Sequence, residues 1–129
     1  MSSAAPSFSR IPFRLVISEK GEVRGELVKH LAPFTNAQLI KAGKVEGVIT
    51  REKEQVVLVA GIKAGLEKSK KEFEAGSVAL LPLDGSIRFI LTNQSVSRPM
   101  NHIGEVKEGM DILAHARSGD RAQLLIEIR

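Results

Sequence analysis

Residues 13–27 read FRLVISEKGEVRGEL, and this segment indicates most directly what kind of fold the chain adopts. Apolar and polar side chains alternate in both of its halves, and a period of two is typical of a strand with one buried face. The polar residues between the halves, Glu19–Glu22, include one glycine for the unusual backbone angles of a tight turn. The segment therefore predicts a β-hairpin.

Strand patterns continue to the end of the chain. Residues 45–62 are divided by the charged turn 51–54, and PLDG at 82–85 is a turn between the apolar segments 78–81 and 87–91. Further strands are expected near residues 103–106 and 122–128. Seven or eight short strands without an internal repeat predict an all-β fold, a closed antiparallel barrel with two short helices covering its ends.

The two helices are expected after Pro33, which suits a first helical turn, and over residues 108–117. Gly43 is the expected end of the first helix. In that helix Phe34, Ala37, Leu39 and Ile40 are expected to form the apolar stripe, with Asn36 and Lys41 facing water. Residues 67–74 fit either a short charged helix or a loop.

Composition fits one globular domain. Of the 129 residues, 43% are hydrophobic and 26% charged, and the chain has no cysteine. We expect a flexible tail over residues 1–11 and the barrel domain over residues 12–129. No apolar run approaches the ~20 residues of a membrane span. The cysteine-free sequence without a signal-peptide pattern predicts a cytoplasmic protein without membrane contact.

Several kinds of chemistry find no support in the sequence. The three histidines lack metal-ligand spacing, so no metal site is expected, and no phosphate-binding glycine loop or nucleophile elbow suggests a cofactor or a catalytic serine. The net charge is +4, but the cluster Lys63, Lys68, Lys70 and Lys71 is interrupted by glutamates. Nucleic acid is thus not an expected partner, because exposed aromatic residues for base stacking are also scarce.

Three segments resemble the cyclophilins, in matching order: GEVRGEL at 21–27 with APFTN at 32–36, GSIRFI at 85–90, and IGEVKEGMDI at 103–112. The resemblance is closest to the small uncharacterised cyclophilin-like proteins of prokaryotes, which carry similar residues at 67–68, 76–79, 82 and 101–104. It covers roughly residues 13–128 and implies a cyclophilin-like barrel.

The catalytic features of the cyclophilins are missing. No F-H-R segment lies between Val45 and Gly76, Arg51 in its charged turn is a poor substitute, and the chain contains no tryptophan for the groove. The glutamine of the family motif matched by GSIRFI becomes Ile87 or Arg88, depending on the register. We therefore expect a binding module without catalytic residues or prolyl isomerase activity, the alternative being a divergent or weak peptidyl-prolyl cis-trans isomerase.

The register of residues 86–92 decides where Arg88 lies. A direct match to the family would bury Arg88 in the aliphatic core, at a cost of several kcal/mol if it were unpaired. Periodicity instead turns Ile87, Phe89 and Leu91 inward, and Arg88 and Ile90 outward. We prefer this register, because it places Arg88 and Ile90 on the face where cyclophilins carry their groove.

Residues 92–101, TNQSVSRPMN, are expected to form a polar loop, and long loops of this kind are often functional. The loop and the outward residues together predict a groove for a small polar or anionic molecule or an extended peptide. The candidate ligand-binding residues are Arg88, Ile90, Arg98, Met100, Asn101 and His102. Nothing in the sequence indicates an oligomeric state.

Overall fold

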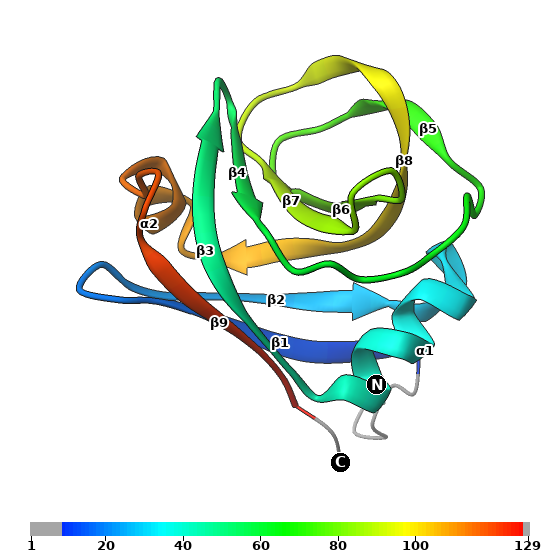
Figure 1. The fold of residues 1–129 in the computed structure, drawn as a ribbon, viewed down its shortest axis with the longest axis horizontal. Helices are drawn as coiled ribbons and strands as arrows, with labels where there is room; N and C mark the ends of the chain where they lie inside the picture. Colours follow the sequence, from blue (N-terminus) through cyan, green and yellow to red (C-terminus); the bar gives the residue numbers. More distant parts are fainter. Residues whose placement is uncertain (1–8, 128–129) are drawn as a thin grey trace, which may run out of the picture.

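Nine strands form a continuous antiparallel sheet in the computed structural model, which describes residues 9–127 (Figure 1). The strands are β1 (Arg10–Ile17), β2 (Gly21–Val28), β3 (Lys44–Glu52), β4 (Gln55–Leu58), β5 (Lys70–Phe73), β6 (Ser77–Leu81), β7 (Ser86–Ile90), β8 (Gln94–Glu108) and β9 (Arg121–Ile126). The helices are the single 3-10 turn η1 (Lys29–Leu31), α1 (Pro33–Ala42) and α2 (Met110–Ala114). No helix among the described residues has both the length and the apolar character needed to cross a membrane.

Eight of the strands close into a barrel. They follow the order β2-β1-β9-β3-β4-β7-β6-β8, and β8 pairs back with β2, while β5 pairs with β8 alone. Two glycines lie where β2 and β8 meet. A Cβ on Gly25 would lie 2.3 Å from the Glu105 carbonyl oxygen, and one on Gly104 would lie 2.2 Å from that of Glu26. The predicted closed antiparallel barrel is confirmed.

The barrel interior is aliphatic, with two phenylalanines in edge-to-face contact. The Phe13 and Phe89 ring centroids are 6.2 Å apart, and Leu15 and Ile17 of the predicted hairpin are buried beside them. Helices α1 and α2 lie on opposite sides of the barrel (Figure 1). Each contributes a fully buried leucine to the core, Leu39 and Leu113 respectively.

A second apolar cluster lies outside the barrel wall. Strand β5 and the first half of β8 fold over the outer face of β6 and β7, burying Phe73, Ala79, Leu81, Ile90 and Met100, with Val96 packed against them. This layer explains why every residue of β6 and β7 is buried. It also provides an apolar surface next to the outward-facing residues of β7.

Three local expectations differ from the structure at the start of the chain. Strand β1 begins at Arg10, which pairs with Val28, two residues before the expected domain start. Residues 1–8 of the expected tail, which was predicted over residues 1–11, lie outside the described residues. In α1, Asn36 is fully buried and Phe34 is 78% exposed, the reverse of the expected faces. The Asn36 side chain donates to the carbonyls of Val28 and Ile103, so these hydrogen bonds allow a polar residue to face the barrel.

Two expectations about loops are wrong. Residues 70–73 form the edge strand β5, not a helix or loop. Three of its four residues are exposed and charged, so its sequence does not alternate between apolar and polar residues. The expected loop 92–101 is strand from Gln94 onward, because β8 extends over 15 residues. Its residues 96–99 have no Cα partner in the pairing with β5 or β6. This irregular stretch explains why the sequence pattern resembled a loop.

Candidate ligand-binding site

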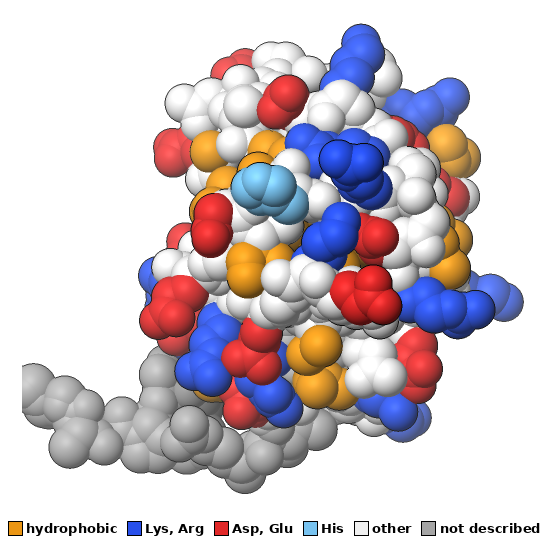
Figure 2. Space-filling model, turned by 90° about the vertical axis from the view of Figure 1, so that its left-hand side faces the viewer, with side chains coloured by type: hydrophobic (Ala, Val, Ile, Leu, Met, Phe, Trp, Pro, Cys, Tyr) orange, Lys and Arg blue, Asp and Glu red, His pale blue; other side chains and the backbone are white. Residues whose placement is uncertain are grey.

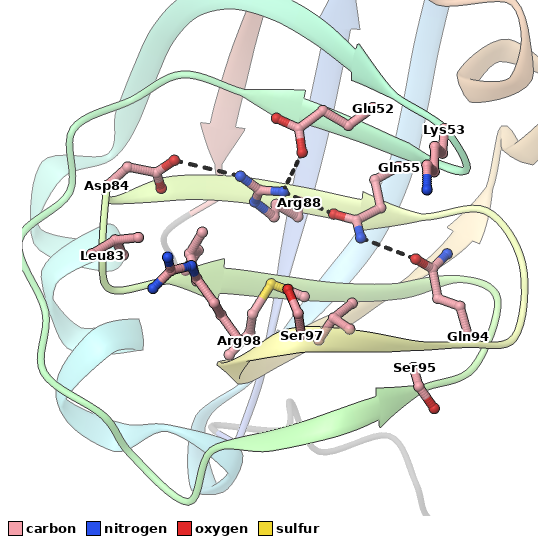
Figure 3. A pocket seen from close by; sticks show the side chains of 13 residues that line it. Glu52, Lys53, Gln55, Leu83, Asp84, Arg88, Gln94, Ser95, Ser97 and Arg98 are labelled. Atoms are coloured by element: carbon pink, nitrogen blue, oxygen red, sulfur yellow. Dashed lines mark hydrogen bonds and ion pairs between the residues drawn. The ribbon is translucent and has the colours of Figure 1, made fainter.

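A pocket of about 690 Å³ lies on the outer face of the barrel. Three segments surround it: the turn between β3 and β4, strand β7 with the turn before it, and the first half of β8 (Figure 3). Its apolar surface comes from the second cluster, through Leu81, Val96 and Met100. Leu83, which is 68% exposed, adds an apolar side chain from the turn before β7. The pocket thus combines an apolar floor with polar walls, as small-molecule sites do.

Arg88 is the central polar residue of the pocket, and only 8% of it is exposed. Its guanidinium donates to Glu52 at 2.9 Å, to the Gln55 side-chain oxygen at 3.1 Å, to Ser86 Oγ at 3.0 Å and to Asp84 at 3.4 Å. Ile87 and Phe89 lie in the barrel core, so the register predicted from periodicity is confirmed. Arg88 lies outside the core as expected, but this network buries it.

The Arg88 network also sets the charge state of Asp84. Partial burial would by itself raise the pKa of the Asp84 carboxyl group. Hydrogen bonds from Ser86 and the nearby Arg88 charge outweigh this effect, and the pKa lies below its ordinary value. Asp84 is therefore an anion at neutral pH, and it compensates part of the Arg88 charge.

A glutamine pair extends the wall toward β8. The Gln55 side-chain nitrogen donates to the Gln94 side-chain oxygen at 3.0 Å, and Gln94 in turn donates to the Glu54 carbonyl. Figure 3 shows Asp84, Arg88, Gln55 and Gln94 as one chain of contacts across the pocket. These bonds fix the β3–β4 turn and the start of β8 relative to each other.

Two cations of the pocket stand apart from this network. Arg98 and Lys53 line the pocket and are exposed, and within residues 9–127 neither side chain has a hydrogen bond or ion pair. The lining contains three cations, Lys53, Arg88 and Arg98, against two carboxylates, Glu52 and Asp84. The pocket is therefore positively charged, and its positive charge is available to a ligand.

The candidate residues from the sequence do not all meet here. Arg88, Arg98 and Met100 line the pocket, while Ile90 lies buried in the cluster beneath it. Asn101 is fully buried and binds Thr35, Gly65 and Glu67. His102 borders a separate hollow with Lys70, Glu74 and Glu105. The structure therefore separates Ile90, Asn101 and His102 from the pocket. The layer of β5 and β8 covers Ile90, Asn101 follows Met100 on the same strand and faces the opposite side, and His102 lines the neighbouring hollow.

His102 contacts a backbone carbonyl and an aromatic ring outside the pocket. Its Nε2 lies 2.9 Å from the Gly104 carbonyl oxygen, and its ring meets Phe73 edge-on at 5.9 Å between centroids. Because a carbonyl can only accept, Nε2 carries the proton in this contact. Burial, and then the charge of Lys70, lower the pKa of His102. Among the described residues, no three His, Asp or Glu side chains are grouped to hold a metal ion.

Sequence reasoning missed several lining residues: Glu52, Lys53, Gln55, Asp84 and Gln94. The first four belong to segments that were interpreted from the sequence only as turns or strand ends. These residues lie close together because β4 pairs with β7, which places Gln55 opposite Ile90. The pairing of strands distant in sequence is not visible in local periodicity, so no signal in the sequence indicated this group.

Arg88→Met is expected to lower the free energy of unfolding by about 2 kcal/mol, because the partners of Arg88 lose its hydrogen bonds, although the half-exposed carboxylates of Glu52 and Asp84 can regain water. Urea unfolding followed by circular dichroism measures this. The matched control is Arg121→Met, since Arg121 is an exposed arginine of β9 and should change stability by less than about 0.5 kcal/mol. Equal stability of the two variants would show that the Arg88 network adds nothing.

Comparison with known proteins shows the fold but no family. No protein-family model matches the chain, and no curated protein matches it. Among solved structures, the hypothetical protein AF2241 from Archaeoglobus fulgidus is similar with a TM-score of 0.73 and 19% identity, over 98% of both chains. McbB, in a structure with tryptophan, is similar with a TM-score of 0.72 and 12% identity; the match covers 91% of this chain and 45% of McbB.

Proposed function

We propose that this chain is a binding protein for a small molecule that carries an anionic group. The observation that carries the proposal is Arg98, a cation without a partner in the described residues, placed beside the Arg88 network and above an apolar floor. A charge-assisted hydrogen bond to an anion is stronger than a neutral one. The apolar floor adds affinity for the uncharged part of the ligand.

A small molecule fits the pocket better than a peptide does. A volume of about 690 Å³ lies within the range of roughly 300–1,000 Å³ found for small-molecule sites. The resemblance to cyclophilin-like proteins supports the location, because Arg88 lies on the outer face of β7, the face on which that family carries its groove. We therefore include a cyclophilin-like origin of the site in the proposal.

Nucleic acid is not part of the proposal. Figure 2 shows acidic and basic side chains interleaved over one face of the molecule, without a large area of one sign. Nucleic-acid binding relies on a basic patch or stripe that follows the phosphates. The partner we propose is thus a small polar molecule, and the cytoplasmic location stays a prediction from the sequence.

Arg98→Ala is expected to weaken binding of an anionic ligand by about 1–3 kcal/mol and to leave the fold intact, because an exposed arginine adds little stability. The probes are acetate, octanoate, inorganic phosphate and tryptophan. Tryptophan is included because it is the molecule in the McbB complex. Two-dimensional NMR shifts of residues around the pocket report binding. Arg121→Ala is the matched control. Anion binding that survives in Arg98→Ala, or shifts confined to another face, would contradict the proposed site.

Prolyl isomerase activity is not expected. Arg51, the arginine nearest to the missing family segment, donates to the carbonyls of Ala114, Ala116 and Lys53. It holds the end of α2 and the β3–β4 turn, so it is not free to polarise a prolyl amide. A protease-coupled assay with a proline-containing tetrapeptide should give the uncatalysed rate. A clear rate above background that is lost in Arg98→Ala would favour the isomerase alternative.

A further inference from the structure

We propose that the ligand is a dianion whose two acidic groups bind Arg98 at one end of the pocket and Lys53 at the other. This inference rests on the proposed function and deepens it by naming the ligand class. It follows from which charges of the pocket are already satisfied and where the unsatisfied ones lie.

The carboxylates of the pocket are already engaged. One oxygen of Asp84 accepts hydrogen bonds from the Ser86 amide at 2.9 Å and the Ser86 hydroxyl at 2.6 Å, and the other accepts from Arg88. Glu52 accepts from Arg88 at 2.9 Å. Because both carboxylates are already paired with Arg88, an ammonium group on a ligand would add a further cation to a lining that already has three cations against two carboxylates. A zwitterionic ligand is therefore disfavoured.

The unpaired charges that line the pocket are both cations. Neither Lys53 nor Arg98 has a side-chain partner in the part of the chain that the structure describes. Figure 3 shows Arg98 beside Leu83 at one end of the pocket, and Lys53 beside Gln55 at the other. The apolar side chains of Leu81, Val96 and Met100 line the same pocket. A molecule with an acidic group at each end and an uncharged middle complements this arrangement.

The backbone at Lys53 supports a role for its side chain. Lys53 has a φ of 51°, in the left-handed region that costs a residue with a Cβ about 1–2 kcal/mol. Turn positions of this kind are usually occupied by glycine or asparagine. Residues held in such conformations are enriched at functional sites. Glu19 and Lys68 share this conformation, but of the three only Lys53 lines the pocket.

The test compares diacids with monoacids of equal length by isothermal titration calorimetry. The probes are the straight-chain dicarboxylates from succinate to suberate, each paired with its monocarboxylate from butanoate to octanoate. We expect at least one diacid to bind tenfold or more tightly than its monoacid. Lys53→Met should remove this advantage and leave monoacid binding unchanged, whereas Arg98→Met should weaken both. Lys41→Met, which changes an exposed lysine of α1, is the control, and melting temperatures verify folding.

The outcomes separate this inference from the proposed function. If monoacids bind through Arg98 and no diacid binds more tightly, the dianion inference is wrong and the anion pocket stands. If the diacid advantage persists in Lys53→Met, the second cation is wrongly assigned. If no acid of the series binds, the dianion inference is wrong, and the proposed function fails as well unless inorganic phosphate binds through Arg98.

Discussion

Gly104→Ala is expected to lower the free energy of unfolding by about 3 kcal/mol or more, because β8 can no longer approach β2 closely enough to close the barrel. The added Cβ would lie 2.2 Å from the Glu26 carbonyl oxygen and 3.0 Å from the Leu27 Cα. Both are backbone atoms, so no side-chain rotation relieves the contact. The two strands would have to separate where Leu27 pairs with Gly104.

Urea unfolding followed by circular dichroism measures this effect. Gly65→Ala is the matched control, because no atom lies within 4 Å of its Cβ position and its φ is not in the left-handed region. It should change stability by less than about 1 kcal/mol, in either direction. If Gly104→Ala were as stable as Gly65→Ala, the barrel would not depend on close contact between β2 and β8.

This contact also gives a physical reason for two of the sequence motifs. Gly25 lies within GEVRGEL and Gly104 within IGEVKEGMDI, and each faces the backbone of the opposite strand across the closure. The motifs therefore mark where the barrel closes. Alternation at Phe13, Leu15 and Ile17 was sufficient to predict the hairpin, since one face of each strand meets the core.

The layer outside the barrel could not be predicted in the same way. Strand β5 exposes Lys70, Lys71 and Glu72, so its sequence carries neither an apolar run nor an alternation. It is a strand only because β8 offers hydrogen bonds next to it, which is a tertiary effect. Without β5 and the extended β8, the apolar floor of the pocket could not be anticipated.

The candidate site was predicted in part for a related reason. Periodicity placed Arg88 outside the core, which is confirmed, and Arg98 lines the same pocket. It could not show that Glu52, Gln55 and Asp84 would surround Arg88, because these residues come from separate turns and strands. The interpretation of residues 92–101 as a loop also concealed that Asn101, three residues after Arg98 on one strand, faces the opposite side.

Asn101→Ala is expected to lower the free energy of unfolding by about 2–4 kcal/mol, because it leaves several polar groups without partners. The Asn101 side chain accepts from the Glu67 amide at 2.8 Å and donates to the Gly65 carbonyl at 2.8 Å and to Thr35 Oγ1 at 3.2 Å. It thereby fixes the segment between β4 and β5 against the barrel.

The loss should spread to the start of α1 through Glu67. The Glu67 carboxylate accepts from the backbone amides of Phe34 and Thr35 at 2.8 and 2.7 Å, and from the Thr35 hydroxyl. It thus satisfies amides at the helix N-terminus that have no partner within the helix. Partial burial would raise the pKa of Glu67, but these hydrogen bonds outweigh it and lower the pKa. The carboxylate is therefore ionised at neutral pH.

Urea unfolding and hydrogen exchange together test the Asn101 prediction. In Asn101→Ala, the amides of Phe34, Thr35 and Glu67 should exchange faster than in the unsubstituted protein, and this increase should exceed any increase in β7. Asn93→Ala is the matched control, because exposed Asn93 makes one hydrogen bond, from the Ala75 amide, and should cost less than about 1 kcal/mol. If Asn101→Ala instead kept its stability and lost anion binding, Asn101 would be a ligand-binding residue, as the sequence predicted. Lost stability with unchanged anion affinity would establish that it anchors the segment between β4 and β5 beside α1.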